Sequence, residues 1–171
     1  MSNLFKASRQ QPFHLSVGAV LTNSEGHICS HYFEPAINRF ETENKNTLYL
    51  LMRETIEEDE TIMSAINRGL LEEFGAKGSV KNFIGSIKSE FPFKNKTGIV
   101  EKTTLYFHVE LIEQDYAWRD KNDYEGNSNL VWLESAMLIK RMETQKSENY
   151  TGLDESMIIK NYLKLKNNKN E

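Results

Sequence analysis

The sequence predicts an α/β fold of the α+β type, a mixed β-sheet with helices packed on it. Residues 13–22 place an apolar side chain at every second position, which is the period of a half-buried strand. Residues 61–74 have the apolar spacing of a helix, and long strand-like stretches follow at 80–91 and 99–112. Strands placed before, between and after a few helices are typical of such a sheet.

The first half of the chain predicts three strands separated by polar segments: residues 13–22, 28–33 and 47–52. Thr61 is expected to cap a helix that runs to about Phe74. Gly75 is expected to end that helix in the left-handed conformation. The acids that precede Thr61 favour a helix N-terminus, so a solvated loop is their ordinary explanation.

The second half predicts three more strands, at 80–91, 99–112 and 130–133, and two helices, at 134–142 and 154–165. A basic turn at 94–96 joins the two long strands, and Asp154 is expected to cap the last helix. The chain has no internal repeat, low-complexity block or linker. We therefore expect one domain over residues 1–171, with its core at about 13–145 and the last helix outside that core.

The bulk properties exclude several classes of protein. A chain of 171 residues with 39% hydrophobic residues is long enough to bury one core. Its net charge of −4 argues against a general nucleic-acid or anionic-membrane partner. The lone Cys29 excludes an internal disulfide and a cysteine-based zinc site. No apolar run resembles a secretory signal or a membrane span, so a cytoplasmic location is expected.

The adjacent acids Glu72 and Glu73 are the most informative residues. They lie in the last turn of the predicted helix, where the helix dipole disfavours negative charge. Glu73 also falls on the apolar side of the helix, between Ile62 and Ile66 on a helical wheel. A sequence that breaks two local rules in adjacent residues points to function, and a divalent cation bound by carboxylates is the simplest candidate.

Residues 54–76 resemble the Nudix box, G-x5-E-x7-R-E-U-x-E-E-x-G-U, in which U is a bulky aliphatic residue. Two positions depart from the pattern, because Glu54 stands in place of its glycine and Gly69 in place of the glutamate that follows its arginine. The matching residues are Glu60, Arg68, Leu70, Glu72, Glu73 and Gly75, with Ala76 as a weaker match.

The resemblance implies an α/β/α sandwich over residues 13 to about 145, in which the box forms a strand, a loop and a helix. It implies a hydrolase that uses Mg²⁺ or Mn²⁺ to cleave the diphosphate of a nucleoside diphosphate-linked substrate. Glu72 and Glu73 would bind the metal, Glu73 and Arg68 would serve catalysis, and Glu60 would be a structural partner. The ordinary alternative for the glutamates is a surface pair at a fraying helix end.

Gly69 removes a carboxylate that many family members use as a metal ligand or base. If the protein is an enzyme, Glu101 or Glu54 is expected to replace it. Glu101 is favoured because it shares a strand face with Leu105 and Phe107, whereas Glu54 is expected to lie on a loop. An ordinary strand-end residue is the alternative for Glu101.

Three cations are candidates for contact with substrate phosphates. Arg53 adjoins the box, and Lys94 and Lys96 lie in the most basic stretch of this acidic chain. Positive charge there would attract a phosphorylated small molecule, although a solvated hairpin tip is the alternative for the two lysines.

Other chemistries fit poorly. The four histidines lack a zinc spacing, and nothing near Cys29 would activate it for the isomerase chemistry found on the same fold. Two hypotheses remain: a metal-dependent pyrophosphohydrolase of nucleotide-type substrates, or a lapsed Nudix-fold module that binds a nucleotide or protein partner. Gly69 favours the second, and the retained pair of glutamates favours the first. A homodimer is common in the family, but no residue pattern here requires one.

Overall fold

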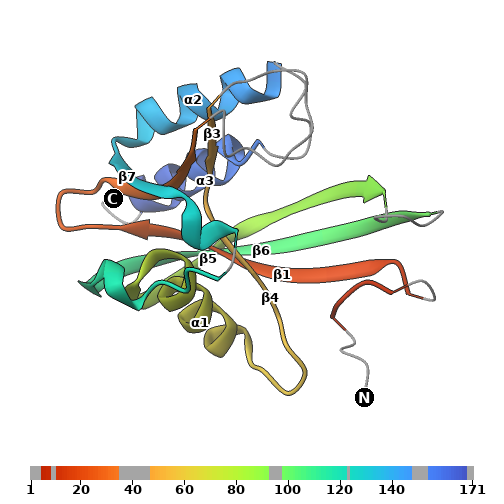
Figure 1. Cartoon of the computed structure of the whole chain (residues 1–171). Coiled ribbons are helices and arrows are strands. Elements are labelled where there is room, and N and C mark those ends of the chain that lie inside the picture. Colours follow the sequence, from red (N-terminus) through yellow and green to blue (C-terminus); the bar gives the residue numbers. More distant parts are fainter. Residues whose placement is uncertain are drawn as a thin grey trace.

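A computed structural model describes residues 5–8, 11–34, 47–92, 98–122, 124–147 and 154–168. The described residues form a mixed seven-stranded sheet, with helix α1 (Ile62–Phe74) on one face and helices α2 (Ser135–Ser147) and α3 (Ser156–Asn167) on the other (Figure 1). This arrangement confirms the predicted class and its layers.

The sheet combines a central parallel pair with antiparallel neighbours. Its main order is β3-β2-β1-β6-β5, with β4 beside β1 and β7 beside β2. Only β1 and β6 run parallel among the pairs that the described residues form. The strands are β1 (Phe13–Thr22), β2 (Ile28–Phe33), β3 (Leu48–Leu50), β4 (Met52–Thr55), β5 (Ala76–Pro92), β6 (Ile99–Gln114) and β7 (Asn129–Leu133).

Alternation along β1 divides the interior into two cores, because successive side chains of a strand point to opposite faces. Val17, Ala19 and Leu21 pack with the apolar side of α1. Val20 faces the other way and packs in the cluster that holds residues of α2 and α3. Each face of the sheet is therefore covered, and polar side chains that lie between the strands and helices have little access to water.

The predicted strand at 47–52 is two strands in the structure. β3 pairs with β2, whereas β4 pairs with β1, so the chain passes from one half of the sheet to the other at Leu51. Local sequence could not show this break, because it depends on which distant strand each segment pairs with. Its result is that Arg53 and Glu54 lie on a strand beside α1, where a loop was expected for Glu54.

Helix α1 has the predicted ends. The hydroxyl of Thr61 accepts a hydrogen bond from the backbone N–H of Ser64 at 3.1 Å, and Gly75 has φ of 59° and ψ of 35°. The apolar side is narrower than predicted at the start of the helix, where Ile62 and Met63 are exposed. The C-terminal half of this apolar side is buried, and it includes Glu73.

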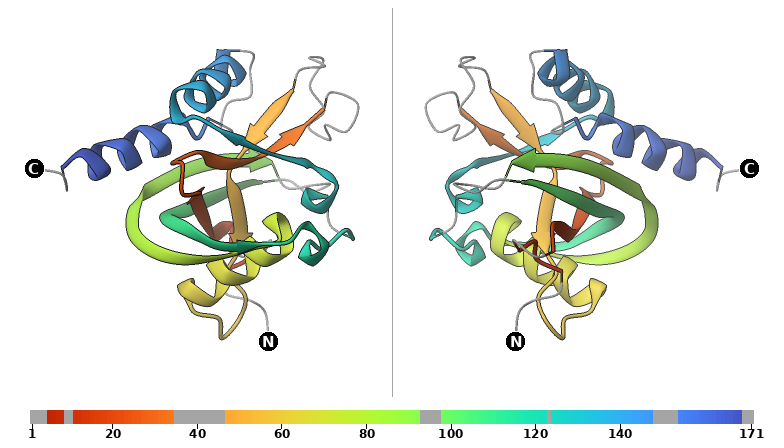
Figure 2. Two further views of the ribbon diagram at one scale, coloured as in Figure 1. Left: turned by 90° about the vertical axis from the view of Figure 1, so that its left-hand side faces the viewer. Right: turned by 90° about the vertical axis from the view of Figure 1, so that its right-hand side faces the viewer.

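Strands β5 and β6 form a long curved ribbon that wraps around the molecule (Figure 2). Both extend beyond the predicted bounds, and β5 begins directly after Gly75. The start of the last helix differs from the prediction in part. Glu155 occupies the N-cap position of α3 without a capping hydrogen bond, whereas the side chain of Asp154 accepts from the backbone N–H of Ser156 at 3.0 Å. No helix of the described part is long and apolar enough to cross a membrane.

Candidate functional site

The side chain of Glu54 occupies the space above Gly69. A Cβ atom built at Gly69 would lie 2.7 Å from the Cβ of Glu54 and 2.8 Å from the sulfur of Met52. Real Cβ atoms do not approach other atoms so closely, so glycine at 69 is what permits β4 to carry Glu54 there. The two departures from the Nudix box are thus in direct contact, and the carboxylate missing from the helix is matched by one from the strand.

Arg68 links three carboxylates beside this contact. Its Nη1 lies 3.2 Å from Glu54 Oε2 and 3.3 Å from Glu72 Oε2. Its Nε and Nη2 donate to the two oxygens of Glu60 at 3.0 and 2.9 Å. Nη2 also donates to the carbonyl oxygen of Thr55, at the end of β4. Arg68 therefore holds strand, loop and helix together, and it brings Glu54 and Glu72 close to each other.

Burial and a neighbouring acid change the pKa of Glu54. Loss of water is the main cause, and the charge of Glu73 adds to it, so the pKa rises to about 7 although Arg68 opposes the shift. A carboxyl group with such a pKa exchanges protons near neutral pH, which is the property that a general base requires. Nothing in the local sequence indicates this value.

Glu73 is buried against a histidine that lies far away in the sequence. Its Oε2 is 2.7 Å from Nε2 of His31 on β2, and the backbone N–H of Arg53 donates to the same oxygen at 3.4 Å. Burial raises the pKa of Glu73 well above its ordinary value and lowers the pKa of His31, so both groups favour their uncharged forms. The other carboxyl oxygen, Oε1, makes no hydrogen bond within the described residues.

A second layer of hydrogen bonds fixes this pair. Nδ1 of His31 is 2.7 Å from the hydroxyl of Ser128, to which Arg119 also donates at 2.9 Å. Nε of Arg119 donates to the backbone carbonyl of Glu73 at 2.6 Å. A cation bonded to a carbonyl in the last turn of α1 offsets the negative end of the helix dipole. Part of the unfavourable field at Glu72 and Glu73 is therefore relieved.

Arg53 lies on the other face of β4, where it pairs with Glu155, the N-cap residue of α3. Its Nε is 3.7 Å from Glu155 Oε1, and Glu155 is only 1% exposed. Glu155 also accepts from the backbone N–H of Leu51 at 2.7 Å and from the hydroxyl of Tyr106. The N-cap residue of the last helix, which was expected to lie outside the core, is thus the acid that positions Arg53.

The structure separates Glu101 from the acidic group. Glu101 is opposite Phe13 on β1, beyond Ser16, the last β1 residue that pairs with β4. It forms an ion pair with Lys88 of β5. Its strand parity was predicted correctly, but its position along the strand depends on the register, which the sequence does not reveal. Lys94 and Lys96 lie outside the described residues.

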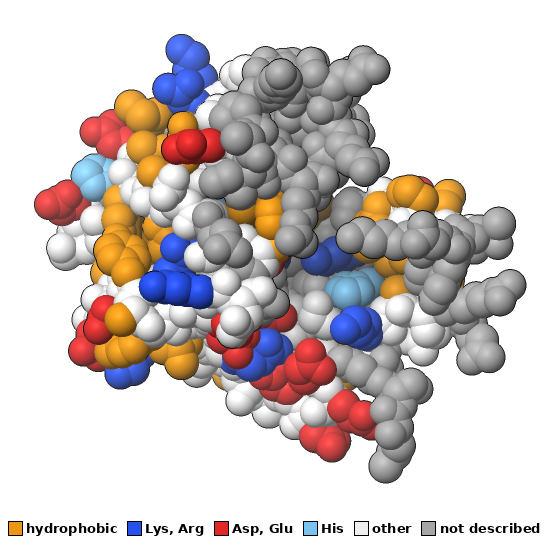
Figure 3. All heavy atoms as spheres, in the orientation of Figure 1, with side chains coloured by type: hydrophobic (Ala, Val, Ile, Leu, Met, Phe, Trp, Pro, Cys, Tyr) orange, Lys and Arg blue, Asp and Glu red, His pale blue; other side chains and the backbone are white. Residues whose placement is uncertain are grey.

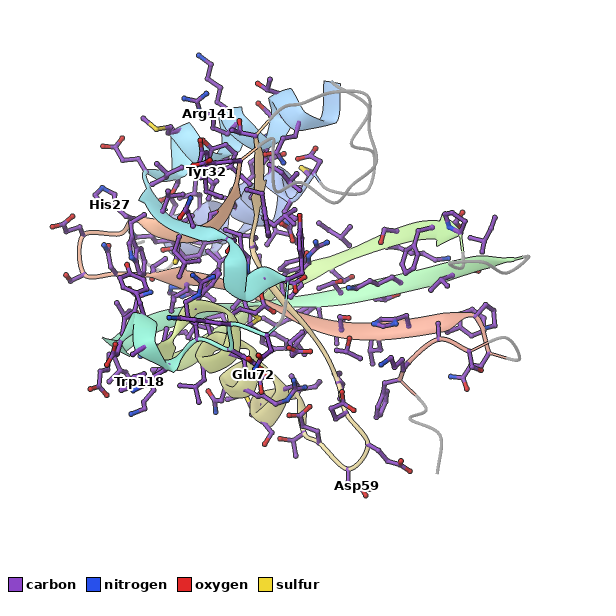
Figure 4. All side chains as sticks on the ribbon, viewed as in Figure 1. His27, Tyr32, Asp59, Glu72, Trp118 and Arg141 are labelled. Carbon is purple, nitrogen blue, oxygen red and sulfur yellow. The ribbon has the colours of Figure 1, made fainter. Side chains whose placement is uncertain are left out.

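Acidic and basic side chains lie next to each other on the surface of the molecule that Figure 3 shows. Figure 3 shows a group of Asp and Glu side chains near the middle of the face, with Lys, Arg and His side chains beside it. Glu72 lies where α1 approaches β4, whereas Asp59 lies at the tip of the loop between them and points away (Figure 4). The acids of the loop tip are exposed, and this agrees with their ordinary explanation.

The carboxylates of Glu54, Glu72 and Glu73 are the kind of ligand that suits a hard divalent cation, but they are not grouped around one point in this structure. Within the described ranges, no three Asp, Glu, His or Cys side chains are arranged as a cation site. Glu54 and Glu72 nevertheless converge on one nitrogen of Arg68, and Oε1 of Glu73 has no hydrogen bond. Carboxylate oxygens are the ligands that Mg²⁺ prefers.

Cys29 has no comparable role, because burial raises its pKa to about 12.

Neither the family models nor the curated protein sequences include a match to this chain. Solved structures do match. A NUDIX hydrolase from Nitrosomonas europaea has a TM-score of 0.58 at 16% identity and covers 86% of each chain. The ORF135 protein of E. coli has a TM-score of 0.54 at 16% identity, covering 90% of this chain and 91% of its own.

The MutT protein from Methanosarcina mazei Go1 has a TM-score of 0.52 at 13% identity, covering 96% of this chain and 100% of its own. Likeness at such low identity shows the fold. The fold expected from residues 54–76 is therefore confirmed over nearly the whole chain.

Proposed function

We propose that this protein is a metal-dependent hydrolase that cleaves the diphosphate linkage of a nucleotide-type substrate, with Glu54 replacing the carboxylate that Gly69 lacks. The single observation that carries the proposal is the contact between these two residues. An accidental loss of the helix glutamate would leave the site short of negative charge. The exchange of glycine and glutamate keeps the number of carboxylates the same.

Glu54, Glu72 and Glu73 would hold Mg²⁺ or Mn²⁺ through carboxylate oxygens. Such an ion, when bound, offsets phosphate charge and lowers the pKa of a water molecule. Arg68 keeps Glu54 and Glu72 facing each other, and His31 keeps Glu73 turned toward β4.

The pKa of Glu54 is about 7 in the metal-free protein, and a bound cation would lower it. Glu54 would then be ionised, and its carboxyl oxygen not bound to the ion would accept the proton of an attacking water. Arg53 would contact a phosphoryl group, because its Nη atoms make no hydrogen bond within the described residues. Its fork of donors matches phosphate oxygens.

The proposal is tested with nucleoside diphosphate sugars, dinucleoside polyphosphates and nucleoside triphosphates in Mg²⁺ or Mn²⁺. Glu54→Gln should reduce kcat on a cleaved substrate by about 10²-fold or more, since a positioned base contributes about that much. Glu101→Gln is the matched control, and its kcat should stay within about threefold of wild type, because an exposed ion pair contributes little.

If Glu101→Gln abolishes activity and Glu54→Gln does not, the assignment of the third carboxylate is wrong. Cleavage that continues at the same rate after removal of all divalent cations would refute the metal-dependent mechanism.

One observation favours the alternative of a lapsed, non-catalytic module. Glu73 is engaged with His31 in a buried pair, so a metal must compete with that hydrogen bond. A protein of this kind would bind a nucleotide without turnover. The alternative is favoured if no compound of the panel is cleaved while at least one binds with the same affinity in Glu54→Gln as in wild type.

A further inference from the structure

Lys102 is a partly enclosed cation that forms no ion pair with the described residues. It lies on β6 between His14 of β1 and Ser89 of β5 in the register of the sheet. It makes no ion pair or hydrogen bond within the described residues, whereas Lys88 on the opposite face of the sheet pairs with Glu101. Loss of water and the nearby charge of Arg53 lower the pKa of Lys102 to about 8, although the acids Glu73, Glu155 and Glu54 oppose the shift. An ammonium group in such surroundings is stabilised by an anion.

Ser16 is a second group without a partner on the same face. Its side chain is 0% exposed, and its hydroxyl is the buried side-chain polar atom that lacks a hydrogen bond within the described part of the chain. Ser16 pairs in register with Thr104 of β6, two residues from Lys102. A buried hydroxyl without a partner is unfavourable unless something binds it.

Shared strand parity places these groups together. His14 and Ser16 on β1 and Lys102 and Thr104 on β6 alternate onto the face away from α1. The close approach of Gly18 to the ring of Tyr106 confirms that the two strands present these positions to the same side. This face carries Arg53 as well, because Arg53 pairs with Gly18 across β1 and β4.

Three acids lie near enough to act on Lys102, namely Glu73, Glu155 and Glu54, but each is engaged by another residue. Nε2 of His14 is 3.1 Å from the hydroxyl of Thr55, and burial, with Lys102 nearby, lowers the pKa of His14 to about 4. His14 is therefore neutral at neutral pH. Glu155 is engaged with Arg53, Leu51 and Tyr106 and does not pair with Lys102. Among the described residues, Lys102 and the hydroxyl of Ser16 thus form no ion pair or hydrogen bond with any of these acids.

We propose that Lys102 and Ser16 bind an oxyanion of the substrate, a phosphoryl group other than the one that is attacked. This inference rests on the proposed function, since it extends the same site. The backbones of Arg53 and Lys102 pair with β1 residues four positions apart, about 13 Å along the strand, and their long side chains bring the two charges near enough to interact. The substrate class is then one that carries a further phosphate in addition to the diphosphate that is cleaved.

The test is binding of inorganic pyrophosphate by titration calorimetry in the presence of a chelator, which removes metal-dependent catalysis from the measurement. Lys102→Met should weaken binding by about tenfold, and Ser16→Ala by about threefold, as expected for a charge-assisted and a neutral hydrogen bond. Lys102→Arg should retain most of the affinity. Lys88→Met, the matched control on the opposite face, should bind like wild type.

Failure of this inference is distinct from failure of the proposed function. Equal binding by Lys102→Met and wild type, or no binding by wild type, overturns the oxyanion site even if the protein hydrolyses nucleotides. Weaker binding in Lys102→Met and Ser16→Ala but not in Lys88→Met upholds the site even if no substrate is cleaved. Because Lys102→Met removes an unpaired charge, it should fold, and its circular dichroism spectrum checks this.

Discussion

The two faces of the sheet at β1, β4 and β6 differ in how their charges are satisfied. On the face toward α1, Glu54, Glu60 and Glu72 all contact Arg68. On the opposite face, Lys102 has no counter-ion and the hydroxyl of Ser16 has no partner within the described residues. Groups that folding leaves unsatisfied are expected where a ligand binds. The first face therefore holds its carboxylates in place, and the second face has the unpaired groups to which we propose that an anion binds.

The largest expected effect concerns Arg68, which organises the first face. Arg68→Met should lower the free energy of unfolding by about 2 kcal/mol, because three carboxylates would lose their cation while the site is only partly exposed to water. Urea unfolding in metal-free buffer measures this. Lys88→Met removes an exposed pair and should change stability by less than about 0.5 kcal/mol. Equal effects of the two variants would contradict the role of Arg68.

The pH dependence of stability should reveal the unpaired lysine of the second face. In the folded protein the pKa of Lys102 is about 8, below its ordinary value of 10.5. As the pH rises from 8 to 10.5, folded Lys102 loses its proton before the unfolded chain does, so the free energy of unfolding rises.

The gain should be on the order of 1 kcal/mol in wild type relative to Lys102→Met. Thermal unfolding of both proteins across this range measures the difference. A wild-type and a variant curve that stay parallel from pH 7 to 11 would show that Lys102 is not desolvated.

The smallest expected effect compares two buried serines. Ser30 donates its hydroxyl hydrogen to backbone carbonyls of His31 or Leu50, at 2.9 and 3.0 Å, whereas Ser16 has no partner. Ser30→Ala should therefore destabilise the protein by about 1 kcal/mol, and Ser16→Ala should be neutral or stabilising by a few tenths. Chemical unfolding of both variants measures these changes. A loss of stability in Ser16→Ala as large as in Ser30→Ala would mean that the hydroxyl of Ser16 has a partner.

The features predicted correctly from sequence depend on neighbours along the chain. The alternation of residues 13–22, the cap at Thr61 and the left-handed Gly75 each follow from a few adjacent residues. Glu73 was correctly expected on the buried side of α1 because helical spacing alone decides that. The box resemblance added the layered fold, since it covers strand, loop and helix at full spacing.

The features that were missed depend on register and on contacts between distant segments. His31 meets Glu73 from 42 residues away, and Glu155 meets Leu51 from 104 residues away. Glu101 was preferred to Glu54 because the local sequence does not reveal the break at Leu51, which places Glu54 on strand β4 with its side chain toward α1. Glycine at 69 was recognised as a departure, but the side chain that fills its space could not be identified.

The central claim is that Glu54 provides the carboxylate that Gly69 lacks, and exchanging the two residues tests it most directly. Mn²⁺ affinity is measured calorimetrically for wild type, Glu54→Gly, Gly69→Glu and the double variant. Glu54→Gly should bind about tenfold more weakly, as the loss of one charged ligand predicts. The double variant should return to within about threefold of wild type, whereas Gly69→Glu alone should be destabilised by crowding against Glu54. Wild-type affinity in Glu54→Gly, or no recovery in a folded double variant, would contradict the account.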